Sequence, residues 1–89
     1  MISRTTARFR EALAELPANM QRQAREAYRM FIRNPNHPSL RFKPVHAIRP
    51  IYAARVSRDY RAVGIVDGET IVWFWIGSHA NYERLLTRL

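Results

Sequence analysis

The segment that most restricts the fold is a run of six apolar residues near the end of the chain, Ile71-Val72-Trp73-Phe74-Trp75-Ile76. Turn-forming residues bound this run on both sides, with Asp67-Gly68 before it and Gly77-Ser78 after it. A short apolar run rich in β-branched and aromatic residues, placed between turn signals, is typical of a buried strand. Asp-Gly is also the strongest hairpin signal in the chain, so strands over 60–66 and 71–76 are expected to pair in antiparallel.

The chain before position 34 has a different periodicity, which is helical. A helix is expected over 4–16, because apolar residues recur there at helical spacing: Phe9, Ala12, Leu13 and Leu16. A second helix is expected over 18–33 from the stripe Met20, Ala24, Ala27, Tyr28 and Phe31. Pro17 ends the first helix and leaves only a short link. The two helices are therefore predicted to form an antiparallel hairpin.

The segment 34–39 is rich in Pro and Asn, and the helical period does not resume after it. Further strands are expected over 40–43, as an irregular or edge strand because of Pro44, and over 51–56, with a short terminal helix over 80–88. We predict a single α+β domain spanning 1–89. Its N-terminal helical hairpin packs on one face of a 3–4-stranded antiparallel sheet, and its other face can form a basic groove.

Charge and composition narrow the function classes. The net charge is +8, and fourteen of the fifteen basic residues are Arg. Arginine grips phosphate bidentately, so the surface favours nucleic acid or an acidic protein as a partner, with a merely soluble basic surface as the alternative. The chain has no cysteine, which excludes a disulfide framework and a thiol nucleophile. Its polar start and short apolar runs predict a cytoplasmic protein with no membrane segment.

A histidine and two arginines form the best candidate for chemistry. His79 follows the apolar strand at the rim of the predicted sheet, where its imidazole could exchange protons with a substrate. Arg55 and Arg61 could stabilise the charge that develops when a phosphodiester is cleaved. The competing interpretation is that His79 is structural or incidental. No metal and no cofactor are predicted, since the sequence has neither a carboxylate cluster nor a phosphate-binding glycine loop.

The hairpin between the two arginines suggests how they are arranged. If Ser57-Arg58-Asp59 is a three-residue loop, Val56 faces Tyr60 and Arg55 lies directly opposite Arg61. Like charges in that position disfavour the sheet, so an anion between them would explain the pair better than stability does. A change of one residue in loop length would remove this pairing, and two solvated arginines are the alternative.

The remaining candidates carry weaker signals. Tyr82 could stack on a base or could simply pack the terminal segment. Asp59 could be a base, but it is also a common turn residue. Lys43 and His46 are possible substrate contacts, although a histidine in a loop is more often a surface residue. Trp73 and Trp75 are expected to share one strand face, in the core or at a protein interface.

Three segments resemble the RelE/ParE superfamily of bacterial toxins: Asn34-Pro-Asn-His-Pro-Ser39-Leu40, Arg55-Val-Ser-Arg-Asp-Tyr60-Arg61 and Gly77-Ser-His79-Ala-Asn-Tyr82. The resemblance covers nearly the whole chain and is nearest to YafQ-like members. It implies a small toxin of a type II toxin–antitoxin pair. RelE-like members cut messenger RNA in the ribosomal A site without a metal, whereas ParE-like members poison DNA gyrase.

The resemblance also implies roles for single residues. Arg55 stands where RelE-like toxins place a basic or histidine active-site residue, and Arg61 matches the Arg of their Tyr-Arg pair. His79 matches the histidine that YafQ-like relatives use in catalysis. Further matches are looser: Asp59 to an acidic residue, Tyr82 to a terminal aromatic, and Lys43 or His46 to basic residues on the preceding strand. The lysines of other members are largely missing.

The expected function is therefore a ribosome-dependent endoribonuclease toxin, with catalytic His79, Arg55 and Arg61. Its expected partners are the ribosome, messenger RNA and an acidic antitoxin that wraps the toxin in an extended form. A gyrase inhibitor is the main alternative. A non-toxic domain that binds nucleic acid through the charge of +8 is another.

Overall fold

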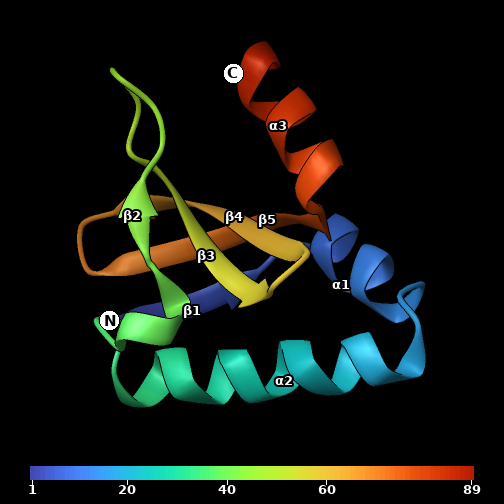
Figure 1. The fold of residues 1–89 in the computed structure, drawn as a ribbon. Coiled ribbons are helices and arrows are strands. Elements are labelled where there is room, and N and C mark those ends of the chain that lie inside the picture. Colours follow the sequence, from blue (N-terminus) through green and yellow to red (C-terminus); the bar gives the residue numbers. More distant parts are fainter.

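A five-stranded sheet with helices on both faces forms the fold in the computed structural model, which describes residues 1–89 (Figure 1). The strands lie in the order β1-β5-β4-β3-β2. Their bounds are β1 (Ile2–Thr5), β2 (Lys43–Pro44), β3 (Ile51–Ser57), β4 (Tyr60–Asp67) and β5 (Thr70–Ser78). The helices are α1 (Ala7–Ala14), α2 (Ala18–Arg33), the 3₁₀ turn η1 (Pro38–Leu40) and α3 (His79–Arg88). The predicted α+β class, the two N-terminal helices and the short terminal helix are confirmed.

The first strand was not predicted, and its presence corrects the expected helix over 4–16. Residues Ile2–Thr5 pair in parallel with β5, so the sheet is mixed and has five strands rather than three or four. The helix begins only at Ala7, where the Thr6 hydroxyl caps it by accepting a hydrogen bond from the Phe9 amide at 3.1 Å. Residues Ile2–Thr5 are extended because they pair with β5, nearly seventy positions away in the sequence. Local periodicity carries no information about such a long-range contact.

The strand expected over 40–43 is also mostly wrong. Leu40 is buried at the end of η1, and Arg41 has a left-handed backbone with φ of 46°. Only Lys43–Pro44 pairs with β3, and these two residues form the edge of the sheet. The alternation of apolar and polar residues there arises from a tight turn whose Leu40 fills the core, and not from an extended strand.

Two irregularities in the sheet change which face each side chain occupies. Val63 pairs with Trp75 and Gly64 pairs with Trp73, so Phe74 is an extra residue in β5. The tryptophans therefore lie on opposite faces, Trp73 against the helices α1 and α2 and Trp75 toward α3. The expectation that they share one face was wrong because a bulge interrupts the period of two.

The sheet thus has a core on each face. On the face covered by α1 and α2, the buried residues include Phe9, Phe31, Trp73 and Ile76. On the other face, Ile51, Ala53 and Val63 of the sheet form a buried cluster with Tyr82 of α3, which lies on that side of the sheet (Figure 1). That face is therefore partly covered, rather than open as expected. None of the helices has the length and apolar character needed to cross a membrane.

Candidate functional site

His79 is held where β5 passes directly into α3. The Ser78 hydroxyl caps this helix by accepting a hydrogen bond from the Asn81 amide at 3.2 Å. The backbone N–H of His79 donates to the carbonyl of Asp59, in the turn between β3 and β4, at 2.7 Å. The imidazole remains accessible, with 44 % of the side chain exposed, and its Nδ1 lies 3.4 Å from Glu83 Oε1. The histidine is therefore tied by its backbone while its ring faces solvent.

Arg55 lies directly opposite Arg61 on neighbouring strands, as the sequence predicts. The loop that was expected to cause this pairing is different. Ser57 pairs with Tyr60 across a two-residue turn, and Val56 is an extra residue in β3 rather than the partner of Tyr60. The bulge replaces the third loop residue, so the register of the two arginines is unchanged.

Arg61 stands in a partly buried cationic environment. Burial lowers the pKa of its guanidinium, and the positive charges of Arg55 and Arg41 lower that pKa further, while Tyr82 and Asp59 raise it. No arginine in the molecule forms an ion pair with a carboxylate; the ion pair of the structure joins His79 and Glu83. Like charges gathered without an ion pair to a carboxylate make a site that favours an anion.

Arg41 is the member of this cluster that the sequence did not reveal. Its influence on Arg61 comes from the segment after η1, where the buried Leu40 anchors the left-handed backbone of Arg41. Leu40 and Arg55 also line the same cavity. The sequence does not indicate that Arg41 lies near Arg61, because the pattern over 40–43 resembles an alternating strand.

Tyr82 lies behind His79 on the first turns of α3. Its ring is edge-on to the imidazole with centroids 5.7 Å apart, and it lies 6.4 Å from the Trp75 ring. Tyr82 is only 8 % exposed, and this burial raises the pKa of its phenol, an effect that Arg61 opposes. These contacts favour the packing interpretation of Tyr82 over a base-stacking surface.

Three other predicted contacts lie around the edges of this region. Asp59 is exposed in the β3–β4 turn, and Lys43 is exposed on β2. His46 has both ring nitrogens engaged: Nδ1 accepts from the amides of Ile48 and Arg49 at 3.1 and 2.8 Å, and Nε2 lies 2.9 Å from the carbonyl oxygen of Leu89. These bonds fix its loop against the end of α3. Nowhere do three or more His, Asp or Glu side chains come together in a way that could hold a metal ion.

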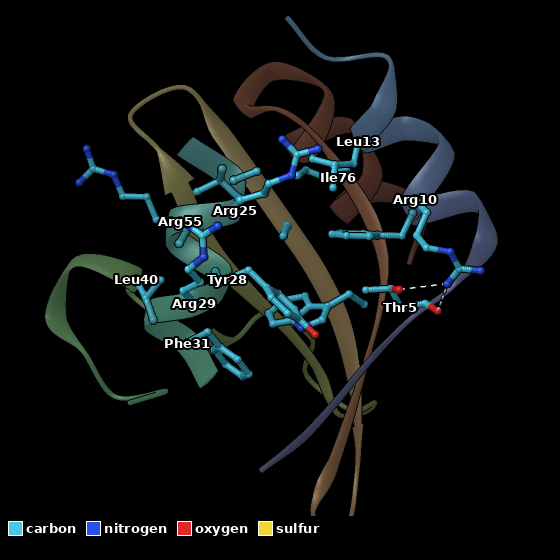
Figure 2. A pocket seen from close by; sticks show the side chains of 17 residues that line it. Thr5, Arg10, Leu13, Arg25, Tyr28, Arg29, Phe31, Leu40, Arg55 and Ile76 are labelled. Carbon is cyan, nitrogen blue, oxygen red and sulfur yellow. Dashed lines mark hydrogen bonds between the residues drawn. The ribbon is translucent and has the colours of Figure 1, made fainter. Parts of the chain in front are cut away.

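A separate cavity of about 290 Å³ lies on the opposite face, between α1, α2 and the sheet (Figure 2). Its lining is mostly apolar and includes Phe9, Leu13, Ala24, Ala62 and Ile76. The cavity exists because α1 packs on β5 and α2 packs on β3, which leaves the strip between them uncovered. Its lining has no histidine and no carboxylate.

Arginines from both helices surround this cavity. Arg10 extends from α1 and donates hydrogen bonds to the carbonyl and hydroxyl of Thr5 at 2.7 and 3.0 Å, while Arg25 and Arg29 extend from α2 (Figure 2). Arg55 contributes to the lining, but its guanidinium points away from the cavity (Figure 2). An apolar floor between cationic rims suits an amphipathic, acidic segment of a partner.

Comparison with known proteins identifies the family to which this fold belongs. The family model described as the ParE-like toxin domain matches residues 18–84. The sequence has no match among curated proteins. Among solved structures, the chain is similar to YafQ from E. coli strain BL21(DE3), with a TM-score of 0.71 and 12 % identity over 90 % of this chain and 94 % of that one.

Two toxin–antitoxin complexes are similar as well. The RelB–RelE complex of Methanococcus jannaschii has a TM-score of 0.69 and 17 % identity over 92 % of this chain and 96 % of that one. The RelBE2 complex of Mycobacterium tuberculosis has a TM-score of 0.68 and 24 % identity, covering 88 % and 96 % of the respective chains. At these identities the likeness shows a shared fold, and the match to the family model covers most of the chain. The chain therefore belongs to the ParE-like toxin domain family, within the RelE/ParE superfamily of toxins.

Proposed function

We propose that the chain is the toxin of a type II toxin–antitoxin pair and that it cleaves messenger RNA on the ribosome. One observation carries this proposal. The accessible imidazole of His79 is joined by a 2.7 Å backbone hydrogen bond to the turn that connects Arg55 and Arg61. A proton-transfer group and unpaired positive charge thus come from adjacent segments of one sheet end, which is what cleavage of a phosphodiester requires.

In the proposed reaction the RNA supplies its own nucleophile. The 2′-hydroxyl loses its proton and attacks the adjacent phosphorus, the bond from phosphorus to the 5′-oxygen breaks, and the leaving oxygen gains a proton. His79 serves as the general acid or base for one of these two proton transfers. Arg55, with the positive charge of Arg61 and Arg41 around it, stabilises the negative charge that develops on the phosphoryl oxygens.

The test is expression of the chain in growing bacteria, followed by mapping of the ends of messenger RNA. The proposal predicts growth arrest together with new 5′ ends that fall at a fixed position within codons. Growth arrest with intact transcripts would refute the proposed nuclease.

A gyrase inhibitor is the second candidate, favoured by the match to the ParE-like family model and by the shortage of lysines near the arginine cluster. Such a protein acts by binding and needs no proton-transfer group. The same experiment distinguishes it, because it predicts induction of the DNA-damage response with intact transcripts. A non-toxic nucleic-acid-binding domain would instead allow normal growth and would bind RNA with a steep dependence on salt.

The proposed partner is an acidic antitoxin encoded beside the toxin gene. Its support comes from the net charge of +8, from the cavity between α1 and α2, and from the similar RelE proteins that were solved with RelB. Apolar side chains of the partner would fill the cavity while its carboxylates meet Arg25 and Arg29 on the rim. Co-expression should rescue growth and yield a complex that co-purifies. Failure of the neighbouring gene product to do either would remove this part of the proposal.

A further inference from the structure

Arg61 directs one end of its guanidinium at the protein's own backbone. Its Nη1 donates to the carbonyls of Ser57, Arg58 and Tyr60 at 2.8, 3.2 and 2.9 Å. All three carbonyls belong to the turn between β3 and β4 or to its flanking residues. Hydrogen bonds from a charged donor are stronger than neutral ones, so this contact fixes a turn that also contains a bulge.

The same turn holds the candidate general acid–base. Asp59 lies inside it, and the Asp59 carbonyl accepts the backbone hydrogen bond of His79 at 2.7 Å. A continuous series of contacts therefore runs from the Arg61 guanidinium through the turn to the first residue of α3. The helix cap at Ser78 fixes the first turn of α3 internally. The pairing of β4 with β5 holds the helix start near Arg61 up to Ser78, and the bond to Asp59 continues this attachment to His79 itself.

Arg55 differs from Arg61 in this respect. Its side chain makes no hydrogen bond within the protein, whereas Arg61 makes three. The Arg55 guanidinium also points outward from the cavity between α1 and α2 (Figure 2). Of the two facing arginines, Arg55 is thus the one whose donors are all available to a phosphate.

We infer that Arg61 is a positioning residue for His79, acting through the β3–β4 turn, and that Arg55 is the arginine that contacts the substrate. This differs from the direct catalytic role that the sequence suggested for Arg61. The catalytic consequence rests on the proposed function, but the coupling between Arg61 and His79 does not.

Amide hydrogen exchange tests the coupling without any assay of activity. In the full-length protein, Arg61→Ala should speed exchange of the His79 amide about tenfold or more, because the carbonyl that protects it is no longer fixed. Arg55→Ala is the matched control and should leave that amide unchanged. Amides in the centre of β5 should be unaffected in both, which separates a local effect from general loss of stability.

Should Arg61→Ala fail to fold, Arg61→Lys provides the second variant. It keeps the charge, but its side chain is one atom shorter and its ammonium ends short of the position that Nη1 occupies among the three carbonyls, so faster exchange at His79 is expected again. Unchanged protection of His79 in every folded Arg61 variant would overturn the inference.

A double-mutant cycle tests the catalytic consequence. If Arg61 acts through His79, adding Arg61→Ala to His79→Ala should lower cleavage no further, while adding Arg55→Ala should still lower it. An equal loss from Arg61→Ala in both backgrounds would mean that Arg61 acts on the phosphate itself and would overturn the inference. Full activity of His79→Ala would instead refute the proposed function and leave the exchange result to decide the coupling.

Discussion

At the scale of single residues, three arginines from different segments lie close enough for their charges to interact, and one of them, Arg61, pairs with Gly77 two residues before His79. Arg41, Arg55 and Arg61 come from the segment after η1, from β3 and from β4, and none is paired with a carboxylate. Arg61 is fixed by backbone carbonyls, whereas the side chains of the exposed Arg41 and the half-buried Arg55 make no hydrogen bond within the protein. Tyr82 closes the site from behind and supports the imidazole of His79.

Arg41 gives a prediction about RNA binding. Arg41→Ala should weaken binding of single-stranded RNA and reduce the slope of log K against log salt by about 0.7, the value for one lost phosphate contact. Arg8→Ala, on the exposed side of α1, is the control and should leave the slope unchanged. Binding isotherms at several salt concentrations measure both. An identical slope for Arg41→Ala and the wild type would exclude Arg41 from the RNA contact.

Tyr82 gives a prediction about pH. Because burial raises the pKa of its phenol above the ordinary value of 10.0, the folded state holds this proton more tightly than the unfolded state does. The contribution of the protonated Tyr82 phenol to the free energy of unfolding is therefore complete below about pH 10. It is lost as the pH rises through the folded-state pKa. Between about pH 8 and about pH 11, the free energy of unfolding should fall less in Tyr82→Phe than in the wild type, because the variant lacks this phenol. Tyr60→Phe is the control, and equal pH dependence in the two variants would contradict the prediction.

At the scale of elements, β1 is attached by a polar contact that joins three parts of the fold. The Ser3 hydroxyl oxygen accepts from the Tyr28 hydroxyl of α2 at 2.9 Å and from the Trp73 indole of β5 at 3.1 Å. Trp73 is only 3 % exposed, so the bond to Ser3 supplies the partner of a largely buried indole N–H. Ser3 thus satisfies a buried donor while it holds the edge strand against the sheet.

Replacing this serine should cost stability. Ser3→Ala leaves the Trp73 N–H without a partner and should lower the free energy of unfolding by about 1–3 kcal/mol. Arg4→Ala, an exposed position on the same strand, should change it by no more than about 0.5 kcal/mol. Urea denaturation followed by tryptophan fluorescence measures both. Equal stability of the two variants would show that the contact to Ser3 is not needed.

The elements also show which parts of the fold can be predicted from the sequence. Helix α2 and strands β3, β4 and β5 have strong local signals. The opposition of Arg55 and Arg61 was predicted from a three-residue loop, and the same register is produced instead by a two-residue turn and a bulge at Val56. The strand β1, the bulge at Phe74 and the left-handed turn at Arg41 had no such signal, because long-range pairing and core packing create them. The bulge at Phe74 alone reversed the face of Trp75, and so the expected tryptophan surface does not exist.

At the scale of the whole molecule, the two faces of the sheet carry different chemistry. The arginine cluster and His79 lie at the end of the sheet where α3 begins, whereas the apolar cavity with its arginine rim lies beneath α1 and α2. The first arrangement suits a phosphate and the second suits an acidic partner. Binding of the partner should therefore be separable from cleavage of RNA.

Charge reversal on the cavity rim tests this separation. Arg25→Glu combined with Arg29→Glu should weaken binding of the acidic partner at least about tenfold, since carboxylates there would face like charges. Cleavage of RNA should remain within about twofold of the wild type, because the arginine cluster is unaltered. The control, Arg8→Glu with Arg88→Glu, makes the same change in net charge at exposed positions away from the cavity. Equal weakening by both pairs would mean that net charge alone, and not the cavity, determines binding.

The central claim is that His79 transfers a proton during cleavage of messenger RNA, and cleavage on purified, programmed ribosomes tests it most directly. His79→Ala should lower the single-turnover cleavage rate by about 10²-fold or more. His37→Ala, which removes a histidine that caps η1, is the control and should cleave at close to the wild-type rate. Unchanged cleavage by a folded His79→Ala protein, or an equal loss in both variants, would contradict the account.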